Sequence, residues 1–155
     1  MIAREAVPTP REILALVPQQ EPFRFIDEIL AVDADHIEAT YRWKEDADFY
    51  RGHFPGNPVT PGVLLIESMA QAGVVALGLY LLAKESSPEE IDNLVTVFTD
   101  ANVEFSGMVK PGDRVRISAK KVFYRRRKLR SEVEMYLEDG TLVCSGILSG
   151  MGVPR

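Results

Sequence analysis

The chain has 155 residues, a formal net charge of −5 and 46% hydrophobic residues, values typical of one globular domain. We therefore expect residues 1–155 to form a single domain. The composition lacks the enrichment in Pro, Gly or charge that marks fibrous and disordered proteins. Cys144 is the only cysteine, which excludes an intrachain disulfide and a cysteine-rich zinc site and fits a reducing cytoplasm.

The N-terminal segment predicts a short helix over Pro10–Leu16, followed by a turn at Pro18-Gln19-Gln20. Charged residues interrupt this segment, so we expect no secretory signal peptide. Two strands are predicted next, at Phe23–Val32 and at His36–Lys44. In the second strand, alternation places four apolar side chains on one face: Ile37, Ala39, Tyr41 and Trp43.

A long apolar segment, Val63–Ala83, predicts a helix that ends before Ser86-Ser87-Pro88. It is long enough to cross a membrane, but Glu67, Ser68 and Gln71 lie in its first half. Because such groups are costly inside a bilayer, we expect the buried core helix of a globular domain and no membrane association.

The second half of the chain predicts four strands separated by turns. They span Leu94–Phe105, Asp113–Tyr124, Leu129–Leu137 and Thr141–Leu148. The predicted fold is therefore of the α+β class, with one long helix against an antiparallel sheet of about six strands. Periodicity does not give the order of these strands.

Positive charge is concentrated between Lys110 and Arg130, where ten basic residues accompany a single acid, Asp113. The other residues carry eight basic and twenty-two acidic side chains. Such a stretch is compatible with a solvated strand face, with a docking site for an acidic partner or with nucleic-acid binding.

The most unusual segment, Arg51–Gln71, is rich in Gly and Pro before the helix. Its PxxP spacing resembles a polyproline ligand, but the segment is short and leads directly into the core helix. Thr60-Pro61-Gly62 instead predicts an N-cap followed by proline at the first helical position. The Gly62 and Val63 amides would then lack intrahelical partners and could stabilise a developing oxyanion.

Two titratable residues of this segment are candidates for acid and base catalysis. Glu67 lies in an apolar helix, so its carboxyl group must be paired, protonated or solvated by a pocket. Gln71 follows one turn later and could orient that carboxyl group. His53 precedes the helix and is a weaker indication by itself, yet together with Glu67 it predicts an acid/base pair.

These residues resemble a known family. The motifs GHFPG, PVTPGVLLIE and MAQ, which follow one another between Gly52 and Gln71, are similar to the signature of the 3-hydroxyacyl-acyl-carrier-protein dehydratases of the FabZ/FabA type, which have the hot-dog fold. Weaker likeness extends over most of the chain. The resemblance implies elimination of water from a 3-hydroxyacyl thioester to give the trans-2-enoyl thioester of fatty acid synthesis, in a homodimer with shared sites that can assemble further into a hexamer.

Carried over by position, His53 would take a proton from C2 and Glu67 would protonate the leaving C3 hydroxyl. Gly62, with Val63 beside it, would bind the thioester carbonyl, and Gln71 would hold Glu67. The resemblance implies no metal and no organic cofactor. A glutamate at the acid position resembles the FabZ branch, so we expect no isomerase activity, and the basic stretch would steer an acidic acyl carrier protein.

Two departures from the family pattern bear on specificity. Gln19-Gln20-Glu21-Pro22 stands where relatives often have a His-Arg-Tyr-Pro-like sequence, and Ser106-Gly107 follows Phe105 where they often have a basic residue and proline. Acyl length, and the choice between carrier protein and coenzyme A, are therefore left open. The alternatives are a hot-dog thioesterase, which has no need of His53, and a non-catalytic acyl-carrier-binding subunit. Because the rest of the chain is acidic, we expect no binding of nucleic acid.

Overall fold

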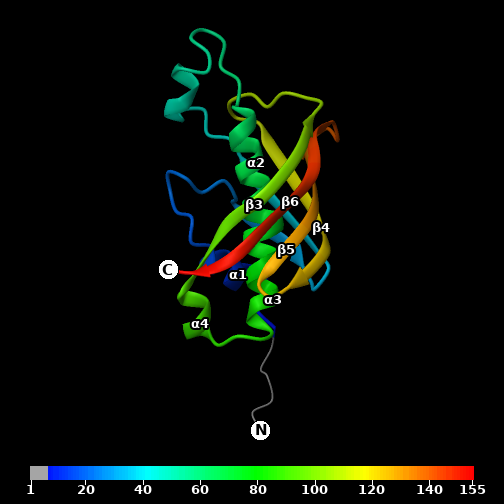
Figure 1. The fold of residues 1–155 in the computed structure, drawn as a ribbon. Coiled ribbons are helices and arrows are strands. Elements are labelled where there is room, and N and C mark those ends of the chain that lie inside the picture. The colour runs from blue at the N-terminus through cyan, green and yellow to red at the C-terminus, as the bar shows by residue number, and fades with distance from the viewer. Residues whose placement is uncertain (1–6) are drawn as a thin grey trace.

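A computed structural model describes residues 7–155 and shows one long helix enclosed by a curved antiparallel sheet (Figure 1). Residues 1–6, which hold part of the charged N-terminal segment, lie outside the described residues. The helical elements are α1 (Pro10–Leu16), the 3-10 turn η1 (Asp48–Arg51), α2 (Gly62–Ala70), the π-helical turn η2 (Gln71–Ala76), α3 (Leu77–Ala83) and α4 (Pro88–Asp92). The strands are β1 (Glu28–Val32), β2 (His36–Arg42), β3 (Leu94–Phe105), β4 (Arg114–Arg125), β5 (Lys128–Leu137) and β6 (Leu142–Pro154).

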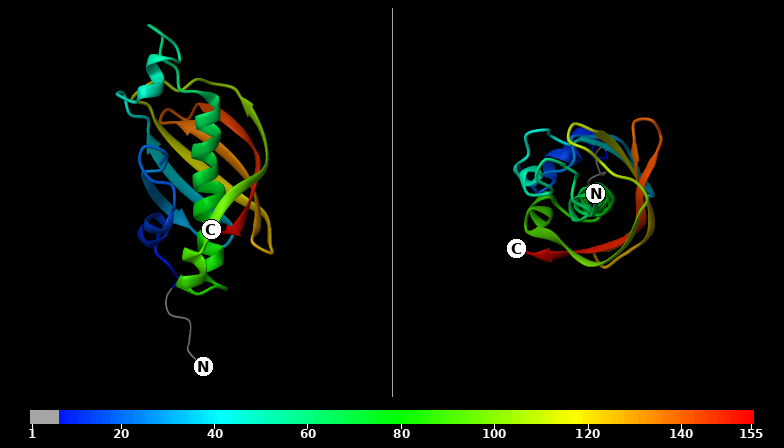
Figure 2. Two further views of the ribbon diagram at one scale, coloured as in Figure 1. Left: turned by 60° about the vertical axis from the view of Figure 1, so that its left-hand side comes forward. Right: turned by 90° about the horizontal axis from the view of Figure 1, so that it is seen from above.

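The six strands form one sheet in the order β1-β2-β4-β5-β6-β3, and every neighbouring pair is antiparallel. Seen from above, the sheet curves around the helix (Figure 2). The expected α+β hot-dog architecture is confirmed. The two edges of the sheet are β1, which α1 packs against, and β3, whose outer edge pairs with no other described strand.

The predicted strands agree with the structure except at their ends. The β3 strand has the predicted bounds, and β6 extends to Pro154 instead of ending at Leu148. The first strand is shorter than predicted, because the backbone of residues 23–25 bonds to side chains of the long helix and not to another strand. Phe25 donates its N–H to Gln71 Oε1 at 2.7 Å, and its carbonyl accepts from Ser68 Oγ at 2.7 Å.

Two short helical elements, η1 and α4, were not predicted. The helix α4 begins at Pro88, where Ser87 and Glu90 form a capping box: each side chain accepts the other residue's backbone N–H. The predicted break at Ser86-Ser87-Pro88 is right for the long helix, which ends at Ala83. Pro88 also starts a new helix, because proline is well suited to the first helical turn.

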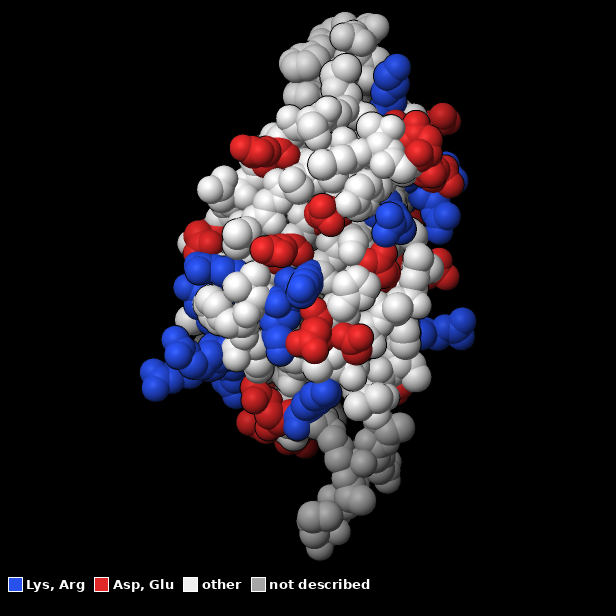
Figure 3. Space-filling model, turned by 90° about the vertical axis from the view of Figure 1, so that its right-hand side faces the viewer, with Lys and Arg blue, Asp and Glu red and all other residues white. Residues whose placement is uncertain are grey.

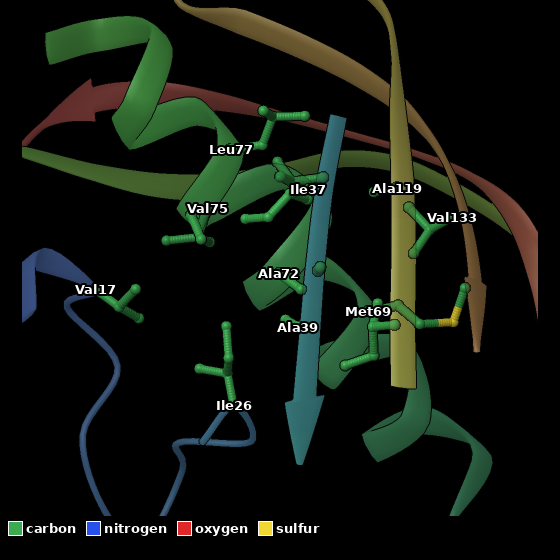
Figure 4. Packing of buried hydrophobic residues seen from close by; sticks show 14 of the residues in the cluster. Val17, Ile26, Ile37, Ala39, Met69, Ala72, Val75, Leu77, Ala119 and Val133 are labelled. Carbon is green, nitrogen blue, oxygen red and sulfur yellow. The ribbon is translucent and has the colours of Figure 1, made fainter. Parts of the chain in front are cut away.

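The helix formed by α2, η2 and α3 occupies the centre of the molecule. It is 22 residues long, from Gly62 to Ala83, and apolar enough to span a bilayer, but most of its apolar stretch is buried inside the protein. Ala72 of the helix lies beside Ala39 of β2, Ile37 lies toward Leu77, and Val133 approaches from β5 (Figure 4). The predicted inward face of β2 is confirmed, since Ile37, Ala39, Tyr41 and Trp43 are at most 4% exposed.

The π-helical turn lies where the helix comes closest to the sheet. A Cβ atom on Gly73 would lie 2.8 Å from Val133 Cγ2 and 3.0 Å from Ala119 Cβ, so this contact depends on glycine. The Gly73 carbonyl accepts a hydrogen bond of 2.7 Å from Ser131 Oγ on β5. A side chain of the sheet thus bonds the helix backbone at this turn.

The substitution Gly73→Ala is expected to lower the free energy of unfolding by about 1–3 kcal/mol, because the added methyl group would overlap the side chains of β4 and β5. Urea unfolding measures the change. The matched control is Gly78→Ala in α3, whose Cβ would meet Leu129 Cδ2 at 3.8 Å, an ordinary contact. This control should be neutral or stabilising by up to about 1 kcal/mol. Equal effects of both substitutions would contradict the close approach at Gly73.

Candidate active site

Glu67 lies in the second turn of α2, where burial raises the pKa of its carboxyl group above the ordinary value. A hydrogen bond from Gln71 opposes this shift without cancelling it. Gln71 Nε2 donates to Glu67 Oε2 at 3.0 Å. Since that oxygen accepts a hydrogen bond, a proton on this carboxyl group resides on Oε1, the other oxygen.

Gln71 has no solvent exposure and uses both ends of its carboxamide. Its Oε1 accepts from the Phe25 N–H, and its Nε2 donates to Glu67 and, at 2.9 Å, to the Phe23 carbonyl. These partners fix which end is oxygen and which is nitrogen. Glu67 is therefore connected through Gln71 to the segment that precedes β1.

His53 lies in the loop between η1 and α2, which projects beyond the end of the sheet (Figures 1 and 2). Its Nδ1 is 2.7 Å from the Val59 carbonyl oxygen. A carbonyl only accepts, so Nδ1 carries the hydrogen and the neutral ring leaves Nε2 free to accept a proton. The loop is held by backbone bonds, including Val59 N–H to the His53 carbonyl at 2.9 Å.

The beginning of α2 differs from the prediction by one residue. Pro61, not Thr60, is the N-cap, and no side chain caps the helix. Thr60 is buried and uses its hydroxyl on Tyr50, with 2.6 Å between the two oxygens, so it is turned away from the helix amides. The expected consequence holds in the described residues: the Gly62 and Val63 amides have no hydrogen-bond partner there.

Glu67 opens onto a cleft of about 50 Å³ between the long helix and β3. Apolar groups form most of its wall, among them Val74 of the helix and Val97 and Phe98 of β3. Gln19, from the segment after α1, also lines it. His53 of the same chain does not, so the structure does not bring the two candidate acid/base residues together within one chain.

Sequence reasoning missed two contributors. Ser68, whose hydroxyl binds the Phe25 carbonyl, could have been recognised as a polar residue on the buried side of the helix. Gln19 was noted as part of a turn and as a departure from the family pattern, but not as a site residue, because its place in the cleft with Glu67 depends on tertiary packing. Within residues 7–155 no cluster of three or more His, Cys, Asp or Glu could hold a metal ion.

The basic stretch divides into two groups. Five of its ten members lie within 4.0 Å of a carboxylate: Arg114, Arg116, Lys121, Arg127 and Arg130. On the face shown in Figure 3, Lys and Arg alternate with Asp and Glu over the middle and gather toward one lower edge. Arg125 and Arg126, at the β4–β5 turn, are exposed and form no ion pair within the described part of the chain.

Comparison with known proteins assigns the family. The profile of the FabA-like domain matches residues 17–146. The chain belongs to the FabA-like domain family. It is 38% identical, over 141 residues, to proteins of Streptococcus pyogenes serotypes M3 and M1 named 3-hydroxyacyl-[acyl-carrier-protein] dehydratase FabZ, and the match covers 90% of this chain and 94% of theirs.

Solved structures agree with this FabA-like fold. The dehydratase heterocomplex ApeI:P of Xenorhabdus doucetiae is similar with a TM-score of 0.77 and 16% identity, over 95% of this chain and 93% of that one. The thioesterase HI1161 of Haemophilus influenzae follows with a TM-score of 0.66 and 20% identity, over 97% and 94% of the two chains. At such identities the likeness concerns the fold alone.

The raised pKa of Glu67 predicts a pH-dependent effect of Glu67→Gln on stability. A carboxyl group whose folded pKa lies above its unfolded value favours folding at low pH, and this contribution is lost as the pH rises through the folded pKa. Glu67→Gln should therefore be more stable than the parent above that pKa, and the gain should shrink toward acid pH. Denaturant unfolding at a series of pH values, at one protein concentration, tests this. A gain that grows toward acid pH would contradict burial as the dominant cause.

Proposed function

We propose that this protein is a (3R)-hydroxyacyl-acyl-carrier-protein dehydratase that removes water from a 3-hydroxyacyl thioester and releases the trans-2-enoyl thioester. The observation that carries the proposal is the Glu67 carboxyl group, held by Gln71 in an apolar cleft with its pKa raised. The chain is 38% identical to the FabZ relatives in a match that covers 90% of its length, which supports the same reaction. In this proposal residues 1–155 constitute a single hot-dog domain, and two copies of that domain form each site.

His53 acts as the base in this mechanism. The bond from Nδ1 to the Val59 carbonyl fixes the tautomer, so Nε2 can take the proton from C2 of the acyl chain. After the transfer, the Nδ1 hydrogen still has its carbonyl partner. The imidazolium ion is therefore stabilised at the moment it forms.

Glu67 acts as the acid. Its raised pKa keeps more of the carboxyl group protonated near neutral pH than an exposed glutamate would be. The proton on Oε1 passes to the C3 hydroxyl as the C–O bond breaks, and water leaves. After water has left, His53 carries the proton from C2 and Glu67 is ionised. Release of the His53 proton to solvent and uptake of a solvent proton by Glu67 return the pair to its starting state.

The start of α2 binds the thioester carbonyl. The Gly62 amide lies at the positive end of a 22-residue helix and has no other partner in the described residues. Negative charge grows on the carbonyl oxygen as the C2 proton departs, and an aligned N–H stabilises it. The ring of Phe105 covers this end of the helix, since a Cβ on Gly62 would lie 3.1 Å from its Cζ.

A second copy of the chain completes the site. The β3 strand is 12 residues long, its outer edge is unpaired among the described residues, and its exposed side chains include Val97, Phe98 and Phe105. Such an edge is stabilised by pairing with another strand. Antiparallel pairing of two β3 edges would carry the projecting His53 loop of one copy alongside the Glu67 cleft of the other. The homodimer has two shared sites, and three dimers can assemble into a hexamer.

The β4–β5 turn is suited to an acidic acyl carrier protein. Arg126 and Arg127 occupy the two turn positions with φ of 51° and 64°, a region that favours Gly or Asn. Two arginines at these strained positions keep positive charge at the tip. In the antiparallel dimer this end of one copy lies beside the His53 loop of the other. A cytoplasmic location gives access to such a carrier.

Loss of either acid/base residue should abolish the reaction. We expect His53→Ala and Glu67→Gln each to lower kcat for reversible hydration of an enoyl thioester by about 100-fold or more, because each removes a proton-transfer group. Absorbance of the enoyl thioester follows the reaction. Product analysis separates it from thioester hydrolysis, which yields free acid and thiol. Hydration that is indifferent to His53 would overturn the mechanism.

Mixing the two inactive variants provides a control for the shared site. A hybrid dimer of His53→Ala and Glu67→Gln chains contains one site in which both residues are intact. Activity that returns after subunit exchange supports a site shared between chains. Continued inactivity of a mixture in which hybrid dimers are detected would contradict it.

Charge reversal at the turn should affect carrier-linked substrates selectively. Arg125→Glu combined with Arg126→Glu is expected to lower kcat/KM for an acyl carrier protein substrate by about tenfold at low ionic strength, with little change for the coenzyme A thioester. The difference should shrink as salt is added. The control is Lys120→Glu, an exposed lysine in the middle of β4. An equal loss with both substrates would exclude a docking role for the turn.

A further inference from the structure

Gln19 lies outside the helices and strands, and its side chain nevertheless carries a buried oxygen atom. Its Oε1 is enclosed and has no hydrogen-bond partner among residues 7–155. The other side-chain atom in this condition, Trp43 Nε1, belongs to a residue stacked on Phe25 in the core. Gln19 instead lines the same cleft as Glu67.

The backbone at Gln19 is firmly held. Arg24 Nε donates to the Gln19 carbonyl at 3.0 Å, while Arg24 Nη2 donates to the carbonyls of Leu14 and Val17 at 2.7 and 3.1 Å. One arginine thus connects the end of α1 to the segment after it. The side chain of Gln19 is positioned by this arrangement, although its own carboxamide oxygen is unpartnered.

A buried polar group without a partner is costly and calls for an explanation, and a ligand group that completes the hydrogen bonding is one. The cleft wall beyond Glu67 is mostly apolar, so it offers the carboxamide little else. Rotation about χ3 exchanges Oε1 and Nε2 and can turn either toward the cleft. A hydroxyl group both donates and accepts, so it can pair with either end.

We infer that Gln19 is a substrate-binding residue whose carboxamide hydrogen-bonds the C3 hydroxyl of the 3-hydroxyacyl thioester in the cleft that it shares with Glu67. This inference rests on the proposed function. The C3 hydroxyl is the only hydrogen-bond donor on an otherwise unsubstituted 3-hydroxyacyl group, and the enoyl product lacks it. Gln19 therefore orients the leaving group toward the Glu67 proton and distinguishes substrate from product.

Binding to an inactive enzyme tests this contact directly. In the His53→Ala protein, calorimetry compares a 3-hydroxyacyl thioester with the saturated acyl thioester of equal length. Adding Gln19→Met, which keeps the length of the side chain but removes its hydrogen-bonding groups, should reduce the preference for the hydroxylated ligand by about tenfold. Gln20→Met is the matched control, because Gln20 is exposed and its side chain bonds only the Val17 carbonyl among residues 7–155. It should leave the preference unchanged.

Turnover measurements distinguish failure of the proposed function from failure of the inference about Gln19. With His53 and Glu67 intact, Gln19→Met and Gln19→Leu should lower kcat/KM for dehydration by about tenfold, while Gln20→Met stays near the parent. A parent without hydration or dehydration activity would refute the proposed function. An active parent whose Gln19 variants match Gln20→Met would overturn the inference alone. Equal weakening of both ligands by Gln19→Met would also overturn it, since that result indicates only a packing role.

Discussion

Burial of the helix from Gly62 to Ala83 is the constraint on which the rest of the structure depends. A helix enclosed by a sheet must supply partners for every polar side chain that it carries inward. Ser68 and Gln71 meet this requirement by bonding the backbone of residues 23–25. That segment is therefore held against the helix and does not extend β1. The same bonds orient Glu67, so the core and the candidate acid share one network.

The sheet curves around the helix, and β3 forms one of its two edges (Figure 2). Between this strand and the helix lies the cleft that contains Glu67, and the outer edge of β3 is unpaired within the described chain. An open apolar edge and an incomplete site therefore occur at the same place. The His53 loop lies beyond the end of the sheet, away from the cleft of its own chain (Figure 1). The proposed site shared between two copies would account for both features, because one pairing event would cover the edge and supply the base.

In the proposed function, the electrostatics of the cleft and those of the β4–β5 turn have separate roles, the first in proton transfer and the second in carrier recognition. The cleft is largely apolar, which raises the pKa of Glu67 and favours proton transfer near neutral pH. Charged residues are concentrated on the outer face of the sheet, where half of the basic stretch is neutralised by neighbouring carboxylates. Arg125 and Arg126 remain at the turn without such partners in the described residues. Long-range attraction can thus act on an acidic carrier without disturbing the acid in the cleft.

The sequence by itself determined the core helix, the bounds of β3, the inward face of β2 and the residues of the candidate site. These features depend on local periodicity and on a continuous motif from Gly52 to Gln71, both of which are present in the linear order of residues. Only the tertiary structure decided the strand order, the late start of β1, the use of Pro61 instead of Thr60 as the helix cap, and the proximity of Gln19 to Glu67. The last three result from competition between hydrogen-bonding partners: Gln71 engages residues 23–25, Tyr50 engages the Thr60 hydroxyl, and Arg24 holds the backbone of Gln19. Periodicity contains no information about such long-range contacts, because it reports which face of an element is apolar and not what packs against that face.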